Sequence, residues 1–233
     1  MSSQKNSLFV TAVVALVGGF AGAALWSAAG FGHANTRDYL LENPDILPQM
    51  AEALQAREAE ERLSQVSGDV MTPFPGAVLG NPDGSKVLVE FTDYGCTYCR
   101  KSVDDLEAMI AADPELKIVI REWPIFQGSD APARMALAAA RQGKFREFHL
   151  AMFAQSSTSP EATERAAGIA GLDMVAAREF TSSREAEFEL MKNRSLAQQL
   201  GFDGTPSWVA GKRLLFGAVG REKLEDALAT AES

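Results

Sequence analysis

The chain contains only two cysteines, Cys96 and Cys99, and two residues separate them. A disulfide across so short a loop removes little entropy from the unfolded chain, so a purely structural bridge would add little stability. Two thiols at this spacing can instead form and break a disulfide with each other by exchange with a third sulfur. The spacing therefore indicates redox chemistry.

The residues around the cysteines predict a strand before them and a helix after them. Lys86–Thr92 contains VLVEF, an apolar run interrupted only by Glu90, as expected of a buried central strand. A helical spacing of apolar residues follows Cys96 to about Ala112, and residues 116–123 have the pattern of another strand. A strand, a helix and a strand of this length predict a parallel pair joined by a right-handed crossover.

This arrangement predicts different roles for the two thiols. Cys96 would begin the helix, where free backbone N–H groups stabilise a thiolate, and Cys99 would lie one turn further on and be more buried. We therefore expect Cys96 to attack and Cys99 to resolve the mixed disulfide.

Two alternatives to redox chemistry remain for these cysteines. Half a zinc site would need about four ligands, and only His33 and His149 are available besides. Two inert core cysteines would not need a strand-to-helix position.

The composition excludes several classes of protein. With 233 residues, 46% of them hydrophobic, the chain can bury a core without a disulfide or a metal, so we expect one globular domain with appendages. The formal net charge of -9 argues against binding to nucleic acid or to an anionic membrane surface. We expect no cofactor and no bound metal.

Residues 1–34 predict an export segment. No charged residue occurs from Asn6 to Thr36, and residues 8–29 are almost all apolar or small. This length suits either a bilayer-spanning anchor of about 20 residues or a cleaved signal peptide, and we favour the anchor. A buried core helix is the third interpretation. Whether this segment is an anchor or a cleaved signal peptide, the rest of the chain would reach a compartment in which disulfides persist.

The remaining residues predict a helical arm and one divided domain. Residues 35–70 are polar and helical, with too few apolar positions for a self-sufficient core helix, so this arm would pack on another copy or on the main domain, or act as a solvated spacer. Residues 71–130 and 201–233 predict the two parts of a small α/β domain. Between them, residues 131–200 are helical throughout, which indicates an inserted all-helical segment.

Three segments carry a resemblance to a known family. FTDYGCTYCRKS and GTPSWVAGKRLLFGAVG resemble the DsbA-like branch of the thioredoxin superfamily, particularly its ScsC-type members, and LLENPDILPQMAEALQ resembles their N-terminal arm. The resemblance spans about residues 38–228. It implies a thioredoxin-like fold with an inserted helical domain, in a periplasmic protein that is tethered to the inner membrane or released after signal cleavage.

The resemblance also implies roles for three residues outside the cysteine pair. Pro206 matches the family's cis-proline, which faces the cysteines and leaves the Thr205 backbone free to pair with a substrate strand. A trans proline at the start of a strand is the alternative. Glu90 matches a buried acidic position that relays the proton of Cys99. The alternative is a solvent-facing glutamate on an edge strand.

The two residues between the cysteines, Thr97 and Tyr98, are expected to contact substrate. They replace the Pro-His pair of the strongest oxidants in the family, and the missing histidine favours a less oxidising couple. Three aromatic residues, Trp123, Phe126 and Trp208, either line an apolar groove for unfolded clients or belong to the core, and the core is the more frequent location.

The sequence therefore predicts an extracytoplasmic oxidoreductase that exchanges disulfides with unfolded or misoxidised proteins, as an oxidase or an isomerase. Its other expected partners are a membrane redox protein of the DsbB-like or DsbD/ScsB-like kind and further copies of itself bound through the arm. Two alternatives are a redox-inactive chaperone or assembly factor, which would not need the cysteine pair, and a copper-handling protein that binds Cu(I) through its thiols.

Overall fold

The computed structural model describes residues 2–28 and 31–230, and the chain divides into two units, residues 1–55 and 56–233. The first unit contains α1 (Ser2–Ala28), α2 (Phe31–Glu42) and the beginning of α3 (Ile46–Met71). Among the described residues, no helix is both long enough and apolar enough to cross a membrane. The predicted bilayer-spanning anchor is therefore not confirmed.

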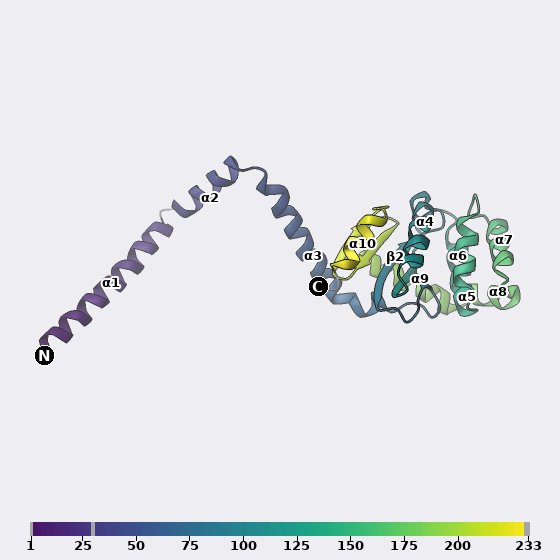
Figure 1. Ribbon diagram of the computed structural model, residues 1–233, viewed down its shortest axis with the longest axis horizontal. Coiled ribbons are helices and arrows are strands. Elements are labelled where there is room, and N and C mark those ends of the chain that lie inside the picture. The colour runs from purple at the N-terminus through teal and green to yellow at the C-terminus, as the bar shows by residue number, and fades with distance from the viewer. Residues whose placement is uncertain (1, 29–30, 231–233) are drawn as a thin grey trace. The chain divides into compact units, whose positions relative to one another are not determined.

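A five-stranded mixed sheet forms the centre of the second unit (Figure 1). Its strands are β1 (Val78–Gly80), β2 (Lys86–Thr92), β3 (Leu116–Glu122), β4 (Ser207–Ala210) and β5 (Arg213–Phe216), in the spatial order β1-β3-β2-β4-β5. β2 and β3 are parallel and are joined through α4 (Thr97–Ala112), which confirms the predicted strand-helix-strand unit. The other three pairings are antiparallel. β2 is thus the middle strand, with neighbours on both sides.

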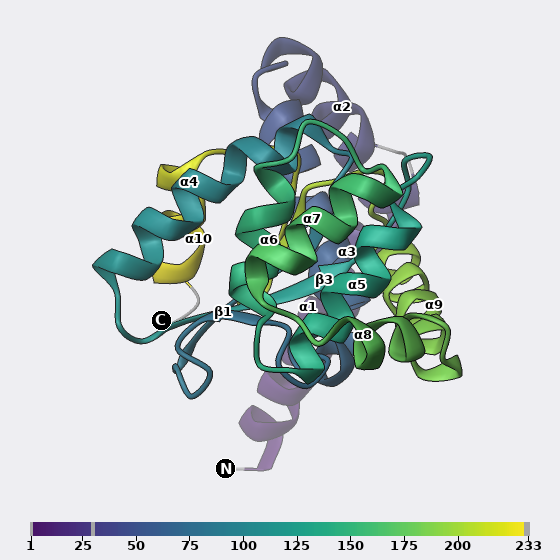
Figure 2. The same cartoon turned by 90° about the vertical axis from the view of Figure 1, so that its right-hand side faces the viewer.

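Helices form the segment between β3 and β4. They are α5 (Asp130–Arg141), α6 (Phe145–Phe153), α7 (Pro160–Ala170), α8 (Met174–Thr181) and α9 (Arg184–Leu200), and α10 (Arg221–Ala229) follows β5. α5 to α8 gather in one bundle (Figures 1 and 2). The Ser159 hydroxyl caps α7 ahead of Pro160, while Gly171 and Gly201 end α7 and α9 in the left-handed conformation that glycine adopts readily.

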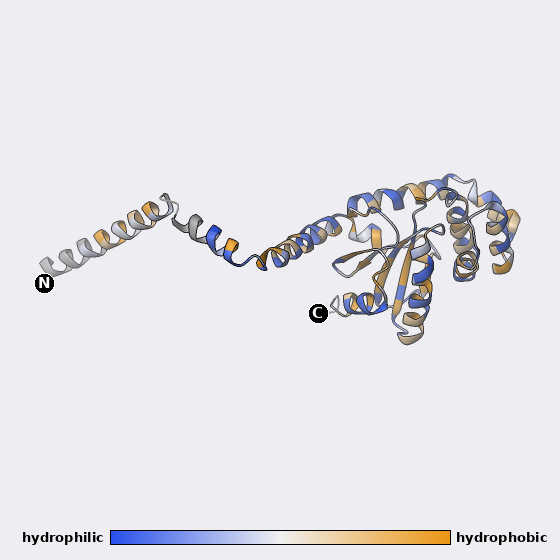
Figure 3. Cartoon of the chain, turned by 90° about the horizontal axis from the view of Figure 1, so that it is seen from above, coloured by the Kyte–Doolittle hydropathy of each residue, from blue (hydrophilic) through white to orange (hydrophobic). Residues whose placement is uncertain are grey.

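Two hydrophobic cores cover the two faces of the sheet. Because side chains alternate along a strand, Leu88 of β2 points into the core that contains both cysteines, whereas Val89 and Phe91 point into the other. The strands carry mostly apolar residues, and the surrounding helices mix apolar and polar ones (Figure 3). A middle strand covered on both faces explains the nearly continuous apolar sequence of β2.

The last turns of α3 are part of the second core. Leu63, Val66 and Val70 are buried there, and each buried side chain of this size contributes about 1.5–3 kcal/mol. The buried Arg121 of β3 fixes the end of the helix, because its guanidinium donates to the carbonyl oxygen of Val70 at 3.1 Å. It also donates to the carbonyls of Asp69 and Thr72. The second half of the arm therefore packs on the main domain of its own chain.

The first half of the arm presents its apolar residues to solvent. Tyr39, Leu41, Leu47, Met50 and Leu54 are all more than half exposed. The expected packing on the main domain is therefore seen for the last turns of α3, whereas these five side chains remain exposed.

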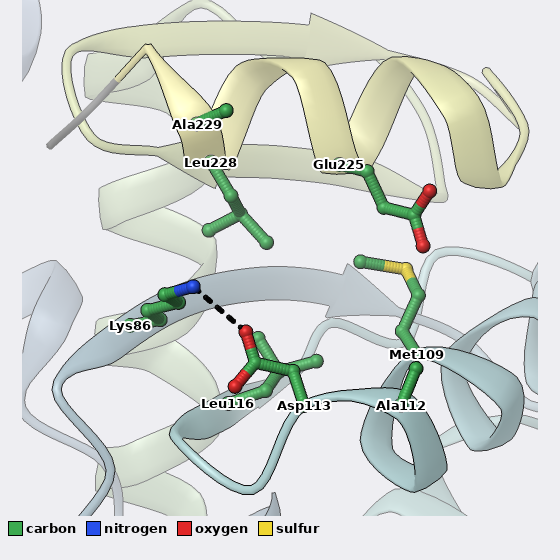
Figure 4. Close-up of a pocket in the computed structure, with 8 residues that line it drawn as sticks. All are labelled: Lys86, Met109, Ala112, Asp113, Leu116, Glu225, Leu228 and Ala229. Atoms are coloured by element: carbon green, nitrogen blue, oxygen red, sulfur yellow. Dashed lines mark hydrogen bonds and ion pairs between the residues drawn. The ribbon is translucent and has the colours of Figure 1, made fainter.

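A pocket of about 250 Å³ lies where β2 and β3 begin and is lined by the residues labelled in Figure 4. It is situated between α10 and the C-terminal end of α4, and the Lys86–Asp113 ion pair of 2.9 Å crosses its floor. Lys86 begins β2 and Cys96 follows the end of β2, so this pocket is remote from the thiol chemistry.

Candidate active site

Cys96 occupies the N-cap position of α4. Its backbone is extended, with φ of -82° and ψ of 118°, and its sulfur accepts a hydrogen bond of 3.3 Å from the backbone N–H of Cys99. The Cys96 thiol donates to the carbonyl oxygen of Thr205 at 3.1 Å. The sulfur therefore lies at the positive end of the helix dipole, as predicted.

The two thiols have opposite acidities. The pKa of Cys96 is lowered from 9.0 to about 6, mainly because the Cys99 thiol donates a hydrogen bond to its sulfur; burial opposes this shift, and the Thr205 side chain and backbone N–H groups reinforce it. Burial raises the pKa of Cys99 far above its usual range, and the Cys96 sulfur and the Glu90 carboxyl add to the increase. At neutral pH, Cys96 is therefore the thiolate and Cys99 the thiol.

Exposure does not distinguish the two cysteines. Cys96 is 2% exposed and Cys99 is 1% exposed, so the expected greater burial of Cys99 is only a small difference in exposed surface. Their different acidities come from the hydrogen bonds to the Cys96 sulfur, which stabilise its anion, and from the burial of Cys99, which penalises its anion.

Glu90 lies on the middle strand, paired with Ile120 on one side and Trp208 on the other. It is 1% exposed, so the alternative of a solvent-facing glutamate on an edge strand is wrong. Burial raises the pKa of its carboxyl to about 8, with a smaller increase from Cys96 and a partial decrease from a hydrogen bond with Thr92. A carboxyl with this pKa can exchange a proton near neutral pH.

The loop before β4 faces the cysteines. The Thr205–Pro206 peptide bond is cis, as the resemblance implied, and the Thr205 carbonyl contacts the Cys96 sulfur. Thr97 and Tyr98, which follow Cys96 in α4, lie on the surface; Tyr98 is 60% exposed, with the Lys101 ammonium 5.5 Å from the centre of its ring.

The sequence pattern did not reveal Asp93, which organises the loop that leads to Cys96. Its buried carboxylate accepts hydrogen bonds from the backbone N–H groups of Gly95 (2.6 Å), Ile125 (2.6 Å) and Phe126 (2.9 Å). A Cβ atom at position 95 would approach the Ser129 hydroxyl to 2.7 Å, so glycine allows the two loops to meet. Two of the three donors come from a loop that is distant in the sequence, so the sequence pattern gave no sign of this role for Asp93.

A buried polar cluster also escaped the sequence pattern. The Tyr94 hydroxyl donates to Glu122 at 3.0 Å and lies 3.1 Å from Nδ1 of His149. Burial raises the pKa of Glu122 well above its usual range and lowers the pKa of His149 to about 3. The His149 imidazole is therefore neutral at pH 7, and His149 is a core residue. Among the described residues no cluster of metal-ligating side chains occurs, and the His33 side chain lies outside the described part.

Of the three aromatic candidates, two are core residues. Trp123 and Trp208 are buried, whereas Phe126 is 49% exposed and lies near Gly95. Of these three residues, only Phe126 is exposed enough to contact a client.

Comparison with known proteins identifies the family. Residues 87–229, more than half of the chain, match the model of the DSBA-like thioredoxin domain. The chain belongs to the DsbA-like thioredoxin family. Residues 36–61, in the arm, match the N-terminal domain of the copper resistance protein ScsC.

Solved structures share the fold of this DsbA-like chain. A thioredoxin-like oxidoreductase from Silicibacter pomeroyi is 40% identical, with a TM-score of 0.64, and the match covers 66% of this chain and 91% of that one. Proteus mirabilis ScsC in a transitional conformation is 25% identical, with a TM-score of 0.66, over 85% of this chain and 92% of ScsC.

A curated protein also matches the sequence. The Na(+)/H(+) antiporter NhaA 3 of Salinispora tropica is 26% identical over 185 residues, which is 76% of this chain. The chain spans only 28% of the length of that antiporter.

Proposed function

We propose that this chain is a periplasmic thiol-disulfide oxidoreductase that acts on client proteins through Cys96 and Cys99. The decisive observation is the Cys96 sulfur at the N-terminus of α4, held by the N–H of Cys99 and facing the carbonyl of Thr205. The family match and the periplasmic location named for a related thioredoxin-like protein of Salmonella enterica support the assignment. The N-terminal segment would direct export, either as an anchor or as a cleaved signal.

The chemistry follows from the two acidities. The Cys96 thiolate attacks one sulfur of a client disulfide, that bond breaks, and one client sulfur leaves as a thiolate. Once the Glu90 carboxyl has lost its own proton, it accepts the proton of Cys99, and Cys99 attacks the Cys96 sulfur, which forms the Cys96–Cys99 disulfide and releases the second client sulfur. The reverse sequence transfers a disulfide to a reduced client.

The backbone of Thr205 is suited to hold the client during this exchange. Its carbonyl already accepts a hydrogen bond from Cys96, and an extended client bound to that sulfur would take over this pairing as an added strand. Thr97 and Tyr98 border the same surface and would contact the flanking client residues.

The acidity of Cys96 supports transfer of disulfides to clients. A pKa of about 6 lies between those of a reducing thioredoxin and a strong oxidant, and thiolate stabilisation favours the reduced enzyme. Equilibration with glutathione should give a potential of about -200 to -150 mV, and Cys96→Ser should abolish the exchange. A potential of about -270 mV would indicate a reductant and would contradict the proposed transfer of disulfides to clients. Repeated turnover would require a membrane redox protein that restores the disulfide between Cys96 and Cys99 after each transfer.

We further propose that the first half of the arm joins several copies into an isomerase. Its apolar side chains are exposed in one chain, and a helix of this kind gains stability by pairing with its equivalents. Leu47→Glu with Leu54→Glu should give monomers by sedimentation and slow the refolding of scrambled ribonuclease more than the reduction of a small disulfide. The matched control is Gln55→Glu, an exposed position without an apolar side chain. Monomers of the unchanged protein would contradict this proposal.

A further inference from the structure

A polar groove of about 660 Å³ opens beside the nucleophilic cysteine, and neither Cys99 nor Glu90 lines it. Its walls are the residues on both sides of Cys96 (Tyr94, Gly95 and Thr97), Arg100 in α4, residues 126–127 after β3, and residues 154–158 after α6. No residue of the Thr205–Pro206 loop lines it. The groove is thus a second surface next to the sulfur, separate from the loop that holds the client backbone.

Arg100 is the charged residue that lines this groove. Its side chain is half-buried, and within residues 2–28 and 31–230 it makes no side-chain hydrogen bond or ion pair. The adjacent Lys101 differs, because its ammonium lies over the Tyr98 ring. No carboxylate lines the groove, although the chain as a whole has a net charge of -9. The groove therefore offers a guanidinium without a partner in an otherwise acidic protein.

The other walls provide groups that suit a carboxylate. Ser156, Ser157 and Thr158 place hydroxyl groups along one side, and the exposed Phe126 ring provides an apolar wall. A guanidinium with neighbouring hydroxyl donors binds a carboxylate through charge-assisted hydrogen bonds.

The position of the groove determines which part of a client can reach it. A client bonded to Cys96 and paired with Thr205 continues past the sulfur in an extended conformation, at about 3.3–3.6 Å per residue. Gly95 and Thr97, the neighbours of Cys96, both line the groove. Side chains within a few residues of the client cysteine can therefore enter it.

We propose that the Arg100 groove binds an acidic side chain close to the client cysteine, so that this protein reacts preferentially with cysteines that have a neighbouring aspartate or glutamate. This inference rests on the proposed function, because it concerns the client of the same exchange reaction.

The test uses synthetic peptides with blocked termini, so that no terminal carboxylate competes. Each peptide carries one cysteine in a mixed disulfide with thionitrobenzoate, and a glutamate is moved through the flanking positions, with glutamine and lysine versions for comparison. The Cys96 thiolate attacks the peptide sulfur, the peptide–thionitrobenzoate bond breaks, and thionitrobenzoate leaves as a coloured thiolate. At one or more positions the glutamate peptide should react about two- to fivefold faster than its glutamine counterpart, with a smaller difference at high salt.

Variants assign the preference to Arg100. Each rate is divided by the rate of the same variant with the glutamine peptide, which removes any general change in Cys96. Arg100→Gln should abolish the preference for glutamate, and Arg100→Glu should reverse it in favour of lysine. Lys101→Gln, the matched control next to it in the sequence, should retain it.

Several outcomes would overturn the proposal. They are equal rates for all peptides with the unchanged protein, an unchanged preference in Arg100→Gln, or an equal loss in Lys101→Gln. Equal rates would leave the proposed function intact. If no peptide reacts while iodoacetamide still alkylates Cys96, the proposed exchange reaction fails together with the groove.

Discussion

Replacing Cys99 by alanine should raise the pKa of Cys96 from about 6 by at least one pH unit and leave mixed disulfides unresolved. The hydrogen bond from the Cys99 thiol is the largest cause of the low pKa, and alanine removes it while leaving the helix N-terminus in place. The ultraviolet absorbance of the thiolate, followed against pH, measures the midpoint. At pH 7 the thiolate fraction should fall from about nine-tenths to about a half or less.

The same variant tests the assignment of roles. Without Cys99, a client captured by Cys96 has no internal thiol to displace it, so covalent complexes should accumulate and disappear on reduction. Ser102→Ala, a small buried residue one turn further along α4, is the control and should leave the Cys96 midpoint near 6. A midpoint that stays near 6 in Cys99→Ala would show that the hydrogen bond between the thiols does not control Cys96.

Replacing Glu90 by glutamine should stabilise the reduced protein at alkaline pH and slow the resolving step. The Glu90 carboxyl has a pKa of about 8 in the folded state against 4.5 ordinarily, mainly because burial penalises its charged form. The folded state therefore binds the proton more tightly than the unfolded state. Its contribution disfavours folding increasingly as pH rises from about 4.5 to about 8, and is fully unfavourable above that window.

The size of this effect follows from the shift of the Glu90 pKa. At about 1.36 kcal/mol per pKa unit, the penalty above pH 8 is at most about 5 kcal/mol. Glu90→Gln should thus match the unchanged protein near pH 4 and exceed its free energy of unfolding by several kcal/mol near pH 9. Urea unfolding across this range measures the difference. Glu147→Gln, on the exposed face of α6, should show no such divergence.

The kinetic half of this prediction is independent of stability. Glutamine cannot accept the proton of Cys99, so release of a leaving thiol from a Cys96 mixed disulfide should slow and lose its dependence on a group with a pKa near 8. If the free energies of unfolding of Glu90→Gln and the unchanged protein change in parallel with pH, the claim that burial raises the pKa of Glu90 is wrong. An unchanged release rate would instead contradict its role as the proton acceptor.

Much of the site was predictable because its residues are close in the sequence. A buried strand that ends before Cys96 and a helix that begins there fix the positions of both sulfurs through local geometry alone. Alternation along the same strand predicts on which face Glu90 lies. The cis bond at Pro206 required the resemblance, because nothing in the local pattern distinguishes it from a trans proline.

The packing of the arm, residues 35–70, was only partly predictable from its sequence pattern. Sparse apolar residues indicated that it needs a partner, but the pattern could not separate Leu63, Val66 and Val70, which pack on the sheet, from the exposed residues before them. The difference depends on which turns of α3 reach Arg121 and the second core, and that is a property of the folded domain.

The sequence by itself was enough to predict redox chemistry for the two cysteines, the order of strands and helices along the chain, and a buried Glu90, because each prediction depends on spacing within one or two adjacent elements. Only the tertiary structure decided how acidic these groups are and what surrounds them. Asp93 finds two of its donors in the loop after β3, Tyr94 meets Glu122 and His149 across two elements, and the groove beside Arg100 forms from three separate segments. Electrostatic interactions depend on distance and burial, and distance between residues far apart in the sequence is fixed only when the chain folds.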